Sequence, residues 1–519
     1  MRQGSVAVIG AGAAGLAAAR ELLREGHKVT VLEQNSRLGG VWVFDERVEK
    51  DDLLGQNSKR GKVHSSMYRH LRTNLPRELM GFSDFPFIPE LLGSRSVDAR
   101  RFCSHTEVLN YLEAFADYFK VKDCIRFNNT VLNVRQLFTS TDRTGTSNNI
   151  MPWQRWVVTS ECEGSDIGVT ESHMITEEYD AVVICNGHNS EPSLPDIKGM
   201  DMFTGFQMHS HNYRDPEQFK GQVVLVVGAA NSGEDISREV ASVASQVHVC
   251  ARSWKQLGLS EAELIAPYGP RRNIHRHPDP IEITQEGNVV FSDGSHLDGE
   301  LHTIIYCTGF QYKFPFLFER EELSHSSGLQ HATEALTIGH SSPYPVVTVK
   351  EQRVDPLWLH IFPPSSAPGM SFLGLTRKTV PFPQLELQAK LVARALSGRI
   401  MLPRPEVMKE EIMAFYEQLK EDNVPTKYTH MQVGQAQWDY NNKLAALCGE
   451  DVPETPSWRM KMAEATGLIK TRHAESYRDV PNLGAESENV CMLQEARTEL
   501  ELIAKTLSVR DFKSDSCKT

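Results

Sequence analysis

The chain has 519 residues, of which 40% are hydrophobic and 24% charged. This is the profile of an ordinary soluble protein of two to four domains, and it argues against a single small module, a coiled coil, a collagen-like chain or a wholly disordered chain. The net charge of −12 opposes binding to nucleic acid or an anionic membrane, yet it permits a local basic pocket for a phosphate.

The first residues and the cysteines bear on where the protein works. The apolar stretch Val6 to Ile9 follows Met1 so closely that we expect no signal peptide. No apolar run approaches the roughly 20 residues that span a bilayer, so we expect no membrane anchor. The nine cysteines occur singly, without a Cys-x-x-Cys pair. We therefore predict a cytoplasmic protein without a metal site.

The first motif is a glycine-rich turn between a predicted strand, Val6 to Ile9, and a predicted helix, Leu16 to Leu23. It has the pattern G-x-G-x-x-G, with Gly10, Gly12 and Gly15 at the fixed positions. The first glycine permits a tight turn, the second admits a pyrophosphate to the backbone, and the third allows close packing of helix on strand. Because the helix N-terminus adds N–H donors, the motif predicts a dinucleotide site.

A second strand, Lys28 to Leu32, ends on Glu33, about 20 residues beyond the glycines. A carboxylate there accepts hydrogen bonds from ribose hydroxyls and repels a 2′-phosphate, so the site favours FAD over NADP. The segment Gly39-Gly40-Val41-Trp42 follows. We expect its backbone to lie against the flavin pyrophosphate and ribityl chain; the alternative is a plain turn with a core aromatic residue.

The middle of the chain carries fewer signals. Phe82, Phe85 and Phe87 are expected in the core or lining a pocket. The Ser/Thr/Asn-rich segment Thr139 to Asn149 predicts a surface loop, and Trp153 to Ser160 predicts a strand.

The strand–turn–helix–strand pattern occurs again after Gln222, which predicts a second dinucleotide fold. Val223 to Val227 precedes a turn that keeps Gly228 and Gly233 but has Ala230 at the middle position. We expect the pyrophosphate to lie farther from this turn, or the turn to open. After the next strand, Arg252 offers a guanidinium suited to a 2′-phosphate, which favours NADPH over NADH; the alternative is a solvated surface cation.

The C-terminal third contains a Pro-rich region, Pro343 to Pro383, predicted to lack regular structure. Helices are predicted at Leu385 to Leu396, Glu406 to Glu421 and Leu493 to Leu507.

Between the two glycine motifs, the linker has the spacing F-x-G-x-x-x-H-x-x-x-Y, filled by Phe203, Gly205, His209 and Tyr213. Composition alone would make this an interdomain loop with a surface histidine. With both glycine motifs, it resembles the fingerprint of the flavin-containing monooxygenases, over roughly Ser5 to Gly398. Tyr213 stands where the related Baeyer–Villiger enzymes usually carry Trp.

The segment Arg72-Thr73-Asn74-Leu75-Pro76 is similar to the compact S-oxygenating branch of this family in plants and to related insect N-oxygenases. The resemblance implies that Asn74 faces the flavin edge where oxygen reacts and is the catalytic residue. The alternative is that Asn74 only forms a turn before Pro76.

The resemblance implies FAD and NADPH as cofactors, and an α/β fold in which an FAD domain holds an inserted NADPH domain. It implies that reduced FAD forms a C4a-hydroperoxide with O2, which oxygenates the sulfur of a thioether or the nitrogen of an amine. The domain boundaries expected are 1–205 and 329–450 for the FAD domain, 206–328 for the NADPH domain and 451–519 for a C-terminal extension. The cofactor-binding residues expected are Gly10, Gly12, Ala14, Gly15, Glu33, Gly40, Trp42, Thr73, Asn74, His209, Gly228, Ser232, Gly233, Arg252, Thr308 and Gly309.

Three alternatives remain from the residues. A Baeyer–Villiger monooxygenase and an NADPH-oxidising or redox-sensing flavoprotein share the two dinucleotide folds. A disulfide oxidoreductase also shares them, but it needs a close pair of redox cysteines. The substrate, the choice between sulfur and nitrogen, and the oligomeric state stay open, with a homodimer as one alternative. No role is assigned to the 139–149 insertion or the 451–519 extension.

Overall fold

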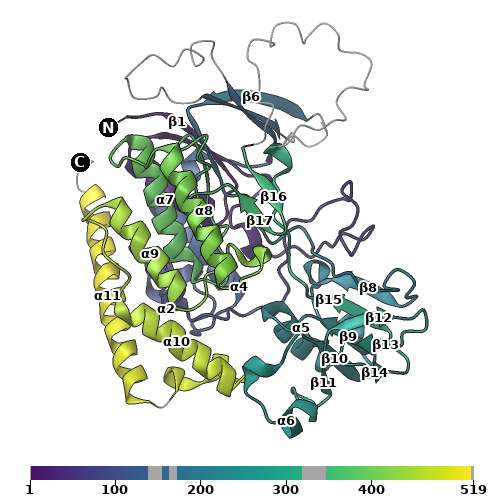
Figure 1. Cartoon of the computed structure of the whole chain (residues 1–519). Coiled ribbons are helices and arrows are strands. Elements are labelled where there is room, and N and C mark those ends of the chain that lie inside the picture. The colour runs from purple at the N-terminus through teal and green to yellow at the C-terminus, as the bar shows by residue number, and fades with distance from the viewer. Residues whose placement is uncertain (1, 138–154, 163–171, 318–345, 485, 516–519) are drawn as a thin grey trace, which may run out of the picture.

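The computed structural model describes residues 2–137, 155–162, 172–317, 346–484 and 486–515 (Figure 1). The predicted loop Thr139 to Asn149 lies outside the described residues. The described part contains two parallel sheets with helices beside them, and one of the glycine motifs follows a strand of each sheet, which confirms the α/β fold with two Rossmann-like domains.

The first sheet has the order β18-β7-β1-β2-β3 among the described strands, and all its neighbours are parallel. The strands are β1 (Ser5–Ile9), β2 (Lys28–Leu32), β3 (Ile125–Arg126), β7 (Ala181–Ile184) and β18 (Met370–Phe372). Apolar residues follow one another without alternation in β1 and β7, because both faces of a parallel sheet are covered.

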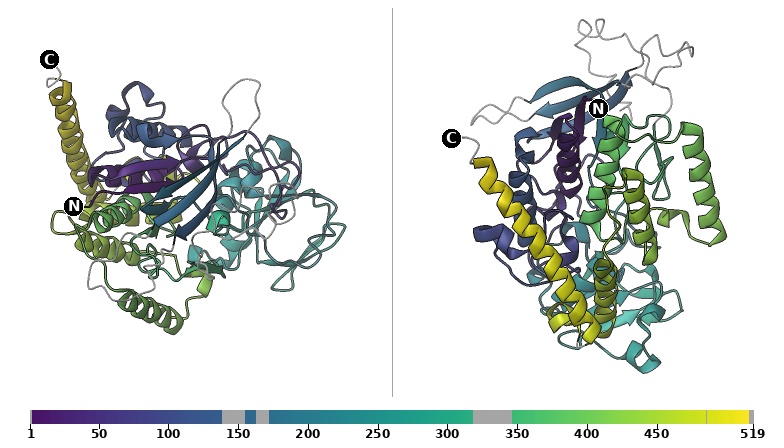
Figure 2. Two further views of the ribbon diagram at one scale, coloured as in Figure 1. Left: turned by 90° about the horizontal axis from the view of Figure 1, so that it is seen from above. Right: turned by 90° about the vertical axis from the view of Figure 1, so that its left-hand side faces the viewer.

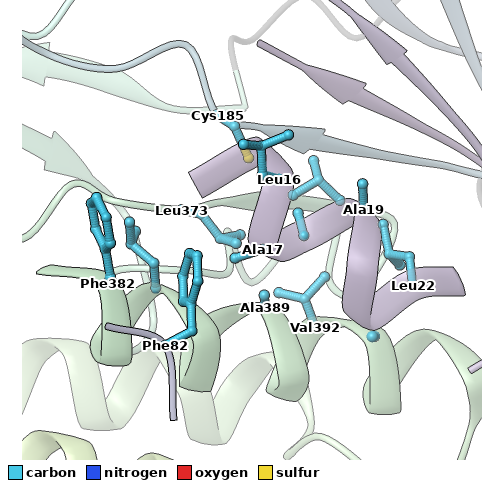
Figure 3. Close-up of a cluster of buried hydrophobic side chains, with 14 of the residues drawn as sticks. Leu16, Ala17, Ala19, Leu22, Phe82, Cys185, Leu373, Phe382, Ala389 and Val392 are labelled. Carbon is cyan, nitrogen blue, oxygen red and sulfur yellow. The ribbon is translucent and has the colours of Figure 1, made fainter. Parts of the chain in front are cut away.

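Helix α1 (Ala13–Arg24) follows the first glycine turn and packs against α7 (Pro381–Ser397). Figure 3 shows Leu16, Ala17 and Leu22 of α1 on one side of this contact and Ala389 and Val392 of α7 on the other. The alanines let the two helix backbones approach closely, so this contact fixes the C-terminal half of the chain against the first glycine turn.

The second sheet has the order β11-β10-β9-β15-β8 among the described strands and is also parallel throughout. Its strands are β8 (Phe206–His209), β9 (Val223–Val227), β10 (Gln246–Cys250), β11 (Ile274–His277) and β15 (Thr303–Tyr306). Helix α5 (Asn231–Ala241) follows the second glycine turn, and Figure 1 shows this unit beside the first.

Smaller antiparallel ladders complete the strands. β4 (Asn129–Leu137), β5 (Arg155–Cys162) and β6 (His173–Tyr179) form one ladder, which crosses the top of the molecule in Figure 2. The others are formed by β12 (Pro280–Ile283), β13 (Val289–Phe291) and β14 (His296–Leu297), and by β16 (Thr348–Lys350) and β17 (Arg353–Asp355).

The longest of the remaining described α-helices lie in the C-terminal part. The remaining described α-helices are α2 (Arg77–Met80), α3 (Pro89–Leu92), α4 (His105–Tyr118), α6 (Glu261–Ile265), α8 (Pro405–Glu421), α9 (Gln435–Cys448), α10 (Ser457–Arg472) and α11 (Ser487–Asp515). The three helices predicted in this region correspond to α7, α8 and α11, whereas α9 and α10 were not predicted. In Figure 1, α10 runs from the foot of α11 toward α5.

Two expectations from composition were wrong. The Pro-rich region 343–383 contains β18, an edge strand of the first sheet, because Met370 to Phe372 is a short apolar run that pairs with β7. The linker contains β8, and His209 at its end is fully buried rather than on the surface. Phe82, Phe85 and Phe87 are core residues, as predicted.

Candidate functional site

One cleft of about 2690 Å³ runs between the two sheets, at the carboxyl ends of β1 and β9, where open α/β sheets bind ligands. Many of the predicted cofactor-binding residues line it: Gly10, Gly12, Ala14, Glu33, Gly40, Trp42, Gly228, Ser232, Arg252, Thr308 and Gly309. The other predicted residues do not line it: Gly15, Thr73, Asn74, His209 and Gly233. Gly15 and Gly233 instead shape the turns beneath the cleft.

The first turn needs its glycines for three separate reasons. Gly10 has φ +99°, which L side chains rarely adopt. A Cβ on Gly15 would lie 1.8 Å from the carbonyl oxygen of Gly10, so the helix can approach the strand only with glycine there. Gly12 caps α1 at φ −75°, and its face toward the cleft is open except for the Cα of Gly40.

The second turn repeats this geometry closely. Gly228 has φ +103°, and a Cβ on Gly233 would lie 1.7 Å from the carbonyl oxygen of Gly228. Ala230 caps α5 at φ −81° and ψ −169°, against −75° and −174° at Gly12. The turn has therefore not opened to accommodate the alanine, and the exposed Ala230 methyl group leaves a ligand farther from the backbone.

Glu33 lies between the first turn and the end of β2. Its carboxylate accepts hydrogen bonds from the backbone N–H of Ala11 at 2.7 Å and of Asn35 at 2.8 Å. Burial raises the pKa of Glu33 above its ordinary value, although these N–H groups lower it in part. The side-chain amide of Asn35 also donates to this carboxylate at 3.0 Å, and the residue Glu33 is almost fully buried yet borders the cleft.

The Gly39–Trp42 segment closes over the first turn. A Cβ on Gly40, whose φ is +57°, would lie 2.9 Å from the Cα of Gly12. The Gly39 N–H donates to the carbonyl oxygen of Ala11 at 3.0 Å. Trp42 lines the cleft, and its ring packs edge-on against the buried Phe382, with 6.4 Å between the ring centres. Trp42 therefore borders the cleft and also contacts the hydrophobic core.

The far end of the cleft is basic. The Arg252 guanidinium lies 5.9 Å from the ring centre of Tyr428, and the ammonium of Lys427 lies 5.4 Å from the same ring. Burial raises the pKa of Asp279, which lines this end, although Arg252 and Lys427 lower it in part. Lys427 and Tyr428 follow α8 in sequence, so the basic end combines two distant parts of the chain.

The linker fingerprint forms a packed junction. A Cβ on Gly205 would lie 2.3 Å from the Phe203 ring. Burial lowers the pKa of His209 to about 3, and its ring packs edge-on against Phe310 at 5.2 Å. The Tyr213 hydroxyl donates to Glu239 of α5 at 2.7 Å. His209 and Tyr213 therefore pack within the second domain and do not line the cleft.

Thr73 and Asn74 are not among the residues that line the cleft. The Thr73 N–H donates to the carbonyl oxygen of Cys103 at 2.8 Å, and the Thr73 carbonyl accepts from Arg478 at 3.0 Å. Asn74 is half-buried at the turn that leads to α2. The catalytic role of Asn74 stays a prediction.

The charge of the cleft contrasts with the charge of the chain. Ten Lys or Arg residues line it against five Asp or Glu residues, although the whole chain carries −12. Sequence reasoning identified one of these cations, Arg252. It missed the other nine: Arg37, Arg47, Lys59, Arg60, Lys62, Lys313, Arg377, Lys378 and Lys427.

These features fit two bound dinucleotides. At each glycine turn the N-terminus of a helix borders the cleft, and no large side chain covers it. The surplus of cations in the cleft suits two pyrophosphates.

Within the described ranges, no group of three or more His, Cys, Asp or Glu is placed to hold a metal ion. None of the eight described cysteines forms a disulfide. No helix in the described part is both long and apolar enough to cross a membrane.

The fold and the two facing turns define a flavoprotein of the two-dinucleotide class. A model of the flavin-binding monooxygenase-like family matches residues 3–258. The Arabidopsis thaliana protein "Flavin-containing monooxygenase FMO GS-OX-like 2" is 44% identical over 91% of this chain and 90% of its own length. The solved structure of S-allyl-L-cysteine S-oxygenase from Allium sativum is 38% identical, with a TM-score of 0.80 over 96% of this chain and 99% of that chain.

The chain therefore belongs to the flavin-containing monooxygenase family, as the linker fingerprint indicated. FAD and NADPH are its cofactors.

Proposed function

We propose that this protein uses NADPH and O2 to transfer one oxygen atom to a soft nucleophile of a small molecule, preferably the sulfur of a thioether. The reaction consumes a thioether, O2, NADPH and a proton, and it releases a sulfoxide, NADP+ and water. The observation that carries the proposal is the pair of matching glycine turns that face one basic cleft. The similarity to an enzyme named as an S-oxygenase supports sulfur over nitrogen.

The chain's own residues bind and orient the cofactors. The first turn and Glu33 hold FAD, which supplies the reduced ring that reacts with O2. The second turn holds the NADPH pyrophosphate, with Arg252 at the 2′-phosphate. With both cofactors bound, the walls of the cleft would shield the reacting atoms from water. No protein acid or base is needed, which agrees with the absence of a Ser/His/Asp pattern in the sequence.

The proposed domain division follows the strands. The first sheet receives β18 from the segment after residue 329, and the second sheet begins with β8 at Phe206. These placements support an FAD domain of 1–205 and 329–450 interrupted by an NADPH domain of 206–328, followed by the extension 451–519, whose described helix α10 contacts both. The cytoplasmic location stays a prediction.

The test is an assay of the purified protein with NADPH and a panel of thioethers, amines and ketones, with mass spectrometry of the products. We expect bound flavin absorbance and thioether products that have gained one oxygen atom. Ester formation from a ketone would instead assign the Baeyer–Villiger reaction. NADPH consumption that yields only peroxide across the whole panel would assign an oxidase or a redox sensor, and either result contradicts the proposal.

Asn74 provides a prediction that separates a turn former from a hydrogen-bond donor. Asp forms turns as readily as Asn but its carboxylate cannot donate. If the Asn74 amide donates at the flavin edge, Asn74→Asp keeps its flavin and its melting temperature while the ratio of oxygenated product to NADPH consumed falls about tenfold, or about 1.4 kcal/mol. Wild-type coupling in Asn74→Asp would instead support the turn alternative.

A further inference from the structure

The C-terminal extension, to which no sequence motif gives a role, reaches the junction of the two dinucleotide domains. The segment between α10 and α11 contains a short 3-10 helix, Tyr477–Asp479. Figure 1 shows this end of the extension approaching α5 of the second domain. The side chain of Arg478 connects the two domains at this point, beside the Tyr68 hydroxyl, which donates to Asp235 of α5 at 3.3 Å.

Arg478 uses all three guanidinium nitrogens. Its Nη2 and Nη1 donate to the two carboxylate oxygens of Asp235 at 2.6 and 3.0 Å, a bidentate pair. Its Nε donates to the carbonyl oxygen of Thr73 at 3.0 Å, and Nη2 also donates to that of Arg72 at 3.3 Å. The Arg478 and Asp235 side chains are 18% and 17% exposed, so water screens this pair only partly.

The partners of Arg478 belong to the two halves of the proposed site. Asp235 lies in the second turn of α5, the helix that begins directly after the second glycine turn. Thr73 immediately precedes Asn74, the residue proposed at the flavin edge. A planar guanidinium holds both sets of acceptors in one fixed arrangement, which a lysine ammonium cannot reproduce.

The extension is itself anchored on both sides of this bridge. Arg459 of α10 donates to the carbonyl oxygens of Leu79 and Gly81 at 3.1 and 3.4 Å, next to the first domain's core. On the other side, Lys470 forms an ion pair with Glu234 of α5 at 3.0 Å, and the N–H of Gly269 donates to Glu475 at 2.8 Å. Arg478 is therefore held on a packed element rather than on a free terminus.

We propose that Arg478 is a positioning residue that sets helix α5, which carries NADP+, in register with the Thr73–Asn74 segment at the flavin edge. This inference rests on the proposed function. Arg478 touches no reacting atom: it acts through Asp235 and through the backbone before Asn74. Its loss would let the second domain shift, so that NADP+ would bind more weakly and water would enter beside the flavin, where the oxygen would be released as peroxide instead of being transferred to the substrate.

The test compares Arg478→Gln and Arg478→Lys with the control Arg472→Gln. The control removes an exposed arginine of the same extension, whose ion pair at 3.1 Å is with Glu486, also in the extension. Three quantities are measured on the FAD-loaded full chain: the ratio of product to NADPH consumed, the Kd of NADP+ by calorimetry, and hydrogen exchange of residues 71–75 and 231–241 with and without NADP+.

We expect Arg478→Gln to weaken NADP+ binding about tenfold and to lower coupling about fivefold, with faster exchange in both segments. Arg478→Lys should lie between Arg478→Gln and wild type, and the KM for the thioether should not change. Asp235→Asn, which keeps the shape of the partner, should reproduce the weaker NADP+ binding if Arg478→Gln does not fold.

The proposal is wrong if NADP+ affinity and coupling match the control in the folded variants, even where the melting temperature falls. A wild-type protein that oxygenates nothing would contradict the proposed function alone, because NADP+ affinity and hydrogen exchange still test the bridge.

Discussion

Gly12→Ala should leave the chain folded and remove its flavin. The new Cβ would meet the Cα and N of Gly40 at 3.5 and 3.9 Å, which are ordinary contacts, and the φ of −75° at Gly12 suits alanine. The methyl group would, however, occupy the side of the turn where the FAD pyrophosphate approaches. We expect FAD affinity to fall at least about 100-fold, or about 2.7 kcal/mol, with loss of the yellow colour and of NADPH oxidation.

The second turn tolerates alanine at the matching position because it is open. Ala230 is exposed, whereas Gly40 lies against Gly12, so a methyl group has more room at the second turn than at the first. This difference suits a flavin that stays bound and a nicotinamide cofactor that exchanges.

The measurement for Gly12→Ala is flavin content by absorbance and FAD affinity by titration of the apoprotein, with circular dichroism to check folding. Gly467→Ala is the matched control, since Gly467 lies in α10 with open space around its Cα and should keep full flavin content. If Gly12→Ala purifies with a full complement of FAD, the first turn does not hold the pyrophosphate.

Arg252→Ala should remove the preference for NADPH. Arg252 is exposed at the basic end of the cleft, where its guanidinium can form two charged hydrogen bonds with a 2′-phosphate. We expect kcat/KM for NADPH to fall about 100-fold, on the order of 2–3 kcal/mol, while kcat/KM for NADH changes less than about twofold.

Steady-state NADPH and NADH oxidation measures this preference. Arg252→Lys keeps the charge but loses the bidentate geometry and should retain part of the preference. Lys255→Ala is the control, because Lys255 is an exposed cation three residues farther on that does not line the cleft. Equal losses with both cofactors would place Arg252 elsewhere than at the 2′-phosphate.

The parts of the site that follow from local sequence were predictable. The backbone geometry of each glycine turn depends on only six consecutive residues. The roles of Gly10, Gly15, Gly228 and Gly233 in the turns were therefore predictable from the sequence alone. Glu33 was predictable for the same reason, since one strand separates it from its turn.

The parts that depend on distant contacts were not predictable. Arg478 lies 243 residues from Asp235 and 405 from Thr73, and no local pattern joins them. Lys427 reaches the basic end of the cleft only because the C-terminal part of the chain packs back over the second domain. The position of His209 was also tertiary, because a buried strand of four residues resembles a loop by composition.

Helix α10 was missed although a signal existed. The buried Trp458, Met462, Ala465 and Ile469 have the spacing of three and four residues typical of one helix face. The run is interrupted by charged residues and by Gly467, which obscured the pattern.

The central claim is that one atom of O2 is transferred to a sulfur atom at the expense of one NADPH. It is tested most directly by oxidation of a thioether under 18O2, with product, NADPH and peroxide measured in the same reaction. The account predicts one sulfoxide for each NADPH consumed, each carrying one 18O atom, with little peroxide. Sulfoxide with oxygen from water, or NADPH consumption matched by peroxide with unchanged thioether, would contradict it.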